Sequence, residues 1–127
     1  MLRIELMNLY QDLNSSKTTG VSVEDSIKWI KIKREWSKKI EESQALFKDI
    51  ASENNVTLKE DGSIDTDKTE KDKLENYNKS INTLLIENLE FDKNLKLTNE
   101  SLCKIKDLNE YPTALFDLLL NTFGNEI

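Results

Sequence analysis

The chain contains two long stretches in which apolar residues recur every three or four positions, separated and flanked by polar segments. The first stretch has no proline or glycine until Gly62, and Ser22 followed by Asp25 resembles a capping box. This pattern predicts a long helix over residues 22–54, about 45 Å in length. Its expected apolar face comprises Val23, Ile27, Ile30, Ile40, Phe47 and Ala51, widened by Trp29, Ile32, Trp36 and Ile50.

The second apolar stretch predicts a long helix over residues 67–92. Asp67 is suited to cap it, with Glu70 at the third helical position. Its stripe consists of Leu74, Tyr77, Ile81, Leu84, Leu85, Asn88 and Leu89. Because each long helix must bury its stripe and the connection is short, the two are expected to pack as an antiparallel helical hairpin.

The connection itself, residues 56–65, is expected to be a turn or a miniature β-hairpin. Val56 and Leu58 alternate with polar residues, and Ile64 is placed to return opposite Leu58. Asp61-Gly62 is typical of a type I′ turn, which needs two residues with positive φ.

The stretch "LKEDGSIDTDKTEKD" is acidic enough to raise the question of calcium binding. An EF-hand loop requires oxygen ligands at fixed positions around its glycine. With Gly62 at the glycine position, Lys59 and Lys68 occupy two ligand positions. The sequence therefore predicts a solvated turn and no metal site, although a looser group of Asp61, Asp65, Asp67 and Glu70 is a minor alternative.

Shorter elements are expected at both ends. Residues 5–14 suit a helix, whereas residues 2–6 also alternate like a strand and could pair with an extended segment at 94–98. Short helices are predicted over 99–106 and over 112–123, the last with Pro112 in its first turn and Gly124 placed to stop it. The whole is expected to be a mainly α fold, one domain over residues 1–127, with at most a small β element.

The amino-acid composition limits the kinds of function that the chain can have. The chain is 33% charged with a net charge of −6, which favours elongated helices with solvated faces and disfavours nucleic acid as the primary ligand. No stretch is apolar enough for a membrane span. There is no histidine, and the single cysteine, Cys103, is expected to be structural. We therefore expect no enzyme, no catalytic residue, no cofactor and no metal.

Two features suggest contact with a partner. Trp29 and Trp36 lie on one face of the first long helix, where they either cover the core or serve a partner. The basic residues Lys28, Lys31, Lys33, Arg34, Lys38 and Lys39 interleave with them. These basic residues are expected to form a solvated helix face that pairs with acids of the second helix, in preference to an anionic ligand site.

The order "LMNLYQDLN", "VEDSIKWIKIKREWSKKIEESQALFKDI", "KEDGSID", "LENYNKSINTLLIENLEFD" and "LKLTNESLCKI" resembles a family of small, uncharacterised bacteriophage helical-hairpin proteins encoded among phage structural genes. The resemblance implies a non-enzymatic virion component or assembly factor, located in the virion or the host cytoplasm. Its expected partners are other phage proteins or copies of itself. The alternative is a small acidic inhibitor of a host protein. The residues predicted to bind a partner are Trp29, Ile32, Trp36, Leu115, Leu119 and Phe123.

Overall fold

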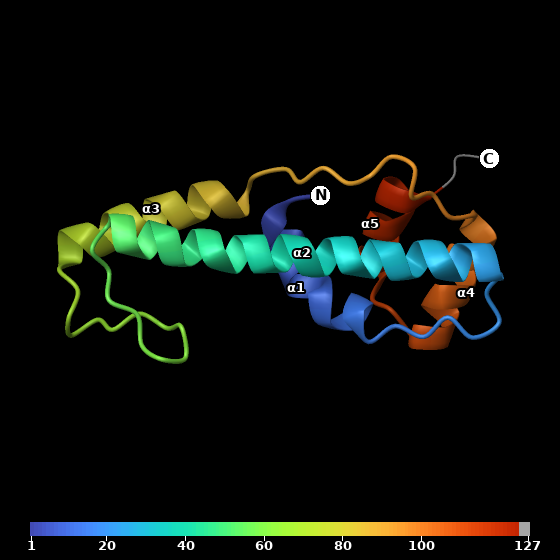
Figure 1. The fold of residues 1–127 in the computed structure, drawn as a ribbon, viewed down its shortest axis with the longest axis horizontal. Coiled ribbons are helices and arrows are strands. Elements are labelled where there is room, and N and C mark those ends of the chain that lie inside the picture. Colours follow the sequence, from blue (N-terminus) through green and yellow to red (C-terminus); the bar gives the residue numbers. More distant parts are fainter. Residues whose placement is uncertain (125–127) are drawn as a thin grey trace.

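The computed structural model describes residues 1–124, which fold into five helices organised along one long helix (Figure 1). This confirms the predicted mainly α fold with a long antiparallel hairpin. The helices are α1 (Arg3–Asn14), α2 (Val23–Glu53), α3 (Lys71–Leu85), α4 (Asn99–Asn109) and α5 (Thr113–Phe123).

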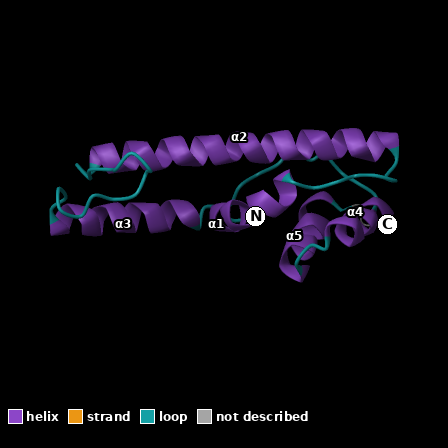
Figure 2. Ribbon diagram, turned by 90° about the horizontal axis from the view of Figure 1, so that it is seen from below, coloured by secondary structure: helices purple, strands orange, loops and turns teal. Residues whose placement is uncertain are grey.

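α2 forms one edge of the molecule, and the other four helices all lie on one side of it (Figure 2). α3 runs beside the C-terminal half of α2, α1 lies against its middle, and α4 and α5 gather near its N-terminal end. At the start of α2, the Ser22 hydroxyl accepts a hydrogen bond from the Asp25 N–H at 3.3 Å, as the capping pattern predicts.

The core lies between α1, the N-terminal half of α2, the segment after α3, and α4 and α5. Its members are Leu6, Leu13, Trp29, Ile32, Trp36, Leu89, Leu95, Leu97, Leu102, Ile105, Tyr111, Leu115, Leu119 and Phe123. No residue of α3, which the structure describes in full, is completely buried. The hairpin arm is therefore a thin extension from a core built at the other end of α2.

The apolar face predicted for α2 is partly wrong. Trp29, Ile32 and Trp36 point into the core, whereas Val23 and Ile27 are exposed on the opposite side. Successive residues of a helix turn by about 100°, so a gap of ten residues, as between Ile30 and Ile40, leaves the second residue about 80° around the helix from the first. The predicted stripe thus combined two different faces.

α3 is shorter than the predicted helix over 67–92. At its start, the Thr69 hydroxyl donates to the Asp65 carbonyl and accepts from the Thr57 N–H, which holds the preceding residues in the tip loop, so Glu70 takes the cap position instead of Asp67. At its end, the chain leaves the helix to bond with the N-terminus.

That N-terminal contact decides between the two alternatives for residues 2–6, because these residues do not pair with residues 94–98. The Arg3 N–H donates to the Glu87 carbonyl at 3.0 Å, and the Leu89 N–H donates to the Met1 carbonyl at 2.7 Å. Residues from Arg3 onward are helical. Leu97 instead makes a parallel bridge to Gly124. A Cβ on Gly124 would lie 2.3 Å from the Leu120 carbonyl oxygen, so only glycine fits this approach.

At the tip, the predicted pairing of Leu58 with Ile64 is confirmed, but the turn type is not. Of the turn residues, only Gly62 has positive φ, at 87°, whereas a type I′ turn needs two. The Gly62 N–H donates to the Lys59 carbonyl and the Lys59 N–H donates to the Ser63 carbonyl. This is the three-residue loop in which glycine forms a bulge. Asp61 supports it by accepting two hydrogen bonds from Ser63, which lower the pKa of Asp61.

Candidate interaction surface

The six residues predicted to bind a partner are all buried in the core. They are Trp29, Ile32, Trp36, Leu115, Leu119 and Phe123, and none is more than 1% exposed. In this fold they cannot form a contact surface, so that prediction is wrong. The physical reason is that large side chains gain most from burial, and Trp29, Trp36 and Phe123 are among the largest fully buried side chains of the core.

Packing among aromatic rings shows how these residues are used. The ring of Phe91 lies 6.1 Å from that of Trp36 and 5.4 Å from that of Phe123, the second pair edge to face. The Lys39 ammonium lies 5.1 Å from the Phe91 ring centroid and covers this cluster. The indole N–H groups of Trp29 and Trp36 have no acceptor among residues 1–124. Both tryptophans therefore serve the core through their apolar area.

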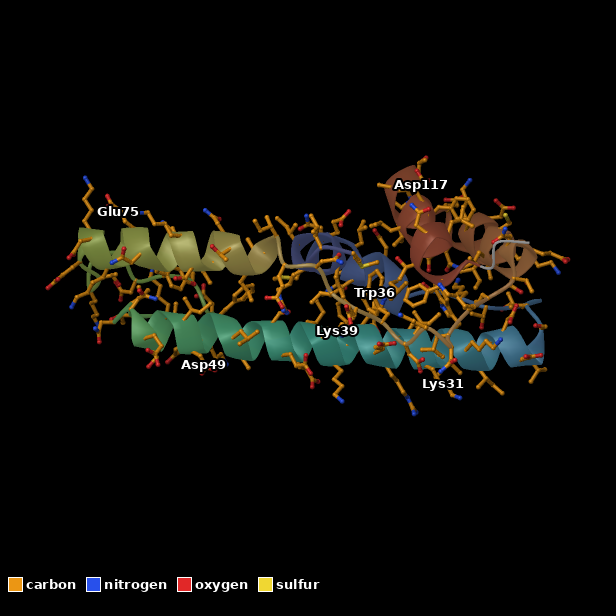
Figure 3. The ribbon with its side chains drawn as sticks, turned by 90° about the horizontal axis from the view of Figure 1, so that it is seen from above. Lys31, Trp36, Lys39, Asp49, Glu75 and Asp117 are labelled. Carbon is orange, nitrogen blue, oxygen red and sulfur yellow. The ribbon has the colours of Figure 1, made fainter. Side chains whose placement is uncertain are left out.

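An apolar surface remains at the N-terminal end of α2. Val23, Ile27 and Ile30 are 78%, 50% and 48% exposed, and their spacing of four and three places them on one face. We call the side of α2 turned away from the other helices its free face. Figure 3 shows Trp36 between α2 and its neighbours, with Lys31 and Asp49 on the opposite side. Three adjacent exposed aliphatic side chains on one helix are more than the scattered exposure usual for a soluble protein.

The apolar group borders basic residues. Lys31, Arg34 and Lys38 are exposed on the following turns of α2. A groove of about 370 Å³ lies beside them. It is lined by Asn14, Ile30, Lys33, Arg34, Ser37, Lys38 and Glu41. The predicted ion pairs between these basic residues and the acids of α3 do not form within residues 1–124, where the salt bridges of α2 and α3 are local.

A buried polar site lies where the N-termini of α2 and α4 meet. Asp25 is 5% exposed, and its Oδ2 accepts hydrogen bonds from the Thr98 N–H, the Thr98 hydroxyl and the Ser101 hydroxyl. Sequence reasoning placed the Asp25 carboxylate back on its own helix cap. In the structure it instead occupies the N-terminus of α4, where the helix dipole favours an anion.

Burial alone would raise the pKa of Asp25, but the hydrogen bonds from Ser101 and Thr98, together with the Lys28 ammonium, outweigh it and lower that pKa. Lys28 also donates to the Lys96 carbonyl at 3.1 Å. The polar cluster is thus satisfied from within the chain. It joins α2 to α4 and leaves the apolar part of the free face as the stronger candidate for contact with another molecule.

A second buried charge joins three elements. Arg3, in α1, donates to the Ser43 hydroxyl of α2 and lies 3.5 Å from the Glu87 carboxylate beyond α3. Its Nε has no partner among residues 1–124. Arg3 is a packing junction between helices, and its role was missed because an arginine near the start of an amphipathic stretch gives no sign of burial.

No protein-family model, curated protein or solved structure matches this chain. Within residues 1–124, no three side chains of the types that bind metals come together, and no helix is both long enough and apolar enough to cross a bilayer. The exposed apolar group of α2 is therefore the feature that bears most directly on function.

Proposed function

We propose that this chain is a non-enzymatic bacteriophage protein that acts by protein–protein contact, as a small virion component or an assembly factor. The observation that supports contact is the apolar group Val23, Ile27 and Ile30 on the free face of α2. Leaving such a group in water forgoes hydrophobic stabilisation of roughly 1.5–3 kcal/mol per fully buried side chain, which a partner would recover. The phage setting follows from the resemblance of the sequence pattern.

The shape of the molecule suits this role. α2 is one unbroken helix of 31 residues, and the other helices leave its free face uncovered. A helix presenting apolar side chains at positions i, i+4 and i+7 is a common recognition element in protein complexes. The basic residues Lys31, Arg34 and Lys38 would then set the orientation of the partner by charge.

Incorporation into particles tests the proposal. The chain is expected in purified phage particles by mass spectrometry, at a constant ratio to the other virion proteins if it is a structural component. Ile27→Ser should reduce its incorporation while leaving its helical circular dichroism unchanged. Asp49→Ser is the matched control, because Asp49 lies on the same free face outside the apolar group.

Absence from particles would support the alternative, a small acidic regulator of a host protein. The exposed acids of the tip loop, among them Glu60, Asp61 and Asp67, favour that alternative. Equal incorporation of Ile27→Ser and Asp49→Ser would contradict the assignment of the apolar group as the contact surface.

A further inference from the structure

The charges on the free face of α2 are arranged asymmetrically around its apolar group. Glu24 is exposed one residue after Val23, at the start of the helix. Lys31 and Arg34 follow Ile30, so the apolar group has an acid at its N-terminal end and bases at its C-terminal end. Such an order is complementary to itself only when two copies run in opposite directions.

We propose that the apolar group of α2 packs antiparallel on the same group of a second copy. This inference rests on the proposed contact function and names its partner. The pairing would be isologous, with a two-fold axis at right angles to both helices, so that every contact occurs twice. In the register that places Ile27 opposite Ile30 of the second copy, all exposed aliphatic residues of this region meet apolar atoms.

The same register pairs the charges. Val23 lies opposite the aliphatic stem of Arg34 of the second copy. Glu24 lies opposite the turn that carries Lys31 of the second copy, on the same lateral side of the interface. Among residues 1–124, Glu24 pairs only with Lys28, at 3.5 Å, and its side chain is 81% exposed, so its carboxylate remains available. Exposed ion pairs of this kind add little free energy but select the orientation.

A parallel pair is disfavoured by the same residues. It would place Arg34, near the centre of the face, against Arg34 of the second copy, and would put Glu24 and Lys31 of the second copy on the opposite lateral side of the interface, where they could not pair. Like charges on facing helices are destabilising, and this selects against the parallel arrangement. A second copy can also approach the free face without a clash, because Figure 2 shows no other helix on that side of α2.

The contact is short, so association should be weak. Three aliphatic side chains from each copy cover much less than the roughly 800 Å² per partner of a standard interface. A dissociation constant in the micromolar range or weaker is therefore expected. In a particle, where many copies are held close together, an interaction of this strength would be sufficient because the effective concentration is high.

Light scattering on the purified full chain tests the proposal. The average mass should rise with concentration from 14.7 kDa toward twice that value. Ile27→Ser should keep the mass at the monomer value, whereas Asp49→Ser should behave as the wild-type chain does. A wild-type chain that stays monomeric up to about 1 mM would overturn the inference.

Exchanging the charges of Glu24 and Lys31 tests the antiparallel orientation of the two copies. Glu24→Lys alone should weaken the dimer at least several-fold, and Glu24→Lys combined with Lys31→Glu should restore it. Circular dichroism of each variant at a concentration where the chain is monomeric controls for changes in the helix itself. Single and double variants with equal dissociation constants would rule out the antiparallel register. A monomeric chain whose Ile27→Ser variant still fails to enter particles would disprove self-pairing while leaving the proposed contact function in place.

Discussion

Replacing Asp25 by Asn should destabilise the fold while preserving its shape. The Asp25 carboxylate joins α2 to α4 through three hydrogen bonds, two of them at 3.1 Å or less. A hydrogen bond to a charged acceptor contributes about 1.5–3 kcal/mol and one to a neutral acceptor about 0.5–1.5 kcal/mol. Removing the charge therefore costs about 1 kcal/mol for each of the two short bonds. The lower desolvation cost of an amide offsets part of this, so we expect a loss of about 1–2 kcal/mol.

The matched control is Glu24→Gln. Glu24 precedes Asp25 in the same first turn, so both substitutions remove one negative charge from the N-terminal end of the α2 dipole. Glu24 is exposed, and within the described part of the chain it pairs only with Lys28. Its replacement should change the free energy of unfolding by less than about 0.5 kcal/mol.

The pH dependence follows from the lowered pKa of Asp25. The folded state binds this proton more weakly than the unfolded state, so the stabilisation is fully present above the unfolded pKa of about 3.9. It is lost as the pH falls through the lower folded pKa. The stability difference between wild type and Asp25→Asn should therefore be largest at neutral pH and shrink in acid.

Urea unfolding followed by circular dichroism, at pH 7 and in steps down to about pH 3, measures all three proteins. Equal stability of Asp25→Asn and Glu24→Gln at pH 7 would contradict the role assigned to the Asp25 carboxylate. A difference in stability between wild type and Asp25→Asn that did not depend on pH would contradict it as well.

Three further pairs of substitutions test other parts of the fold by the same denaturation assay. Phe123→Ala should cost about 3–5 kcal/mol because Phe123 is fully buried, whereas Phe116→Ala, at a half-buried position, should cost less. Gly62→Ala should cost about 1 kcal/mol from its positive φ alone, since nothing lies near the added Cβ, and Gly62→Asn should cost less. Arg3→Met should be tolerated within about 1 kcal/mol, because it removes a buried charge but keeps the packing, while Arg3→Ala should be clearly destabilising. Equal effects within any of these pairs would contradict the corresponding assignment.

Local signals in the sequence were reliable where a short pattern determines a short structure. The Ser22 hydroxyl accepts a hydrogen bond from the Asp25 N–H, as the spacing of the two residues predicts. The pairing of Leu58 with Ile64 likewise follows from alternation around a turn. These features depend on neighbours within a few residues, so the sequence contains the necessary information.

Features that depend on distant contacts were not predictable in this way. α3 ends at Leu85 because the following residues bond with Met1 and Arg3, which are more than eighty positions away in the chain. The orientation of α2 about its axis was also open, because both Trp29 and Ile27 lie on apolar stretches and only tertiary packing decides which of them faces the core. The candidate surface was missed for this reason. A helical-wheel projection does group Val23, Ile27 and Ile30 beside Arg34, and this grouping is the signal in the sequence that separates the two apolar faces.

The thin arm formed by α3 and the C-terminal half of α2 has a consequence for how the molecule opens. α3 contributes no completely buried side chain, whereas α5 buries Leu115, Leu119 and Phe123. Segments with few buried contacts open at a lower free energy than the rest of a protein. The backbone amides of α3 should therefore exchange with solvent through local opening, while those of α5 should exchange only when the whole chain unfolds. The arm would then unfold separately from the core, so unfolding of the molecule would not be fully cooperative. A ligand that bound the tip would stabilise the arm without altering the core.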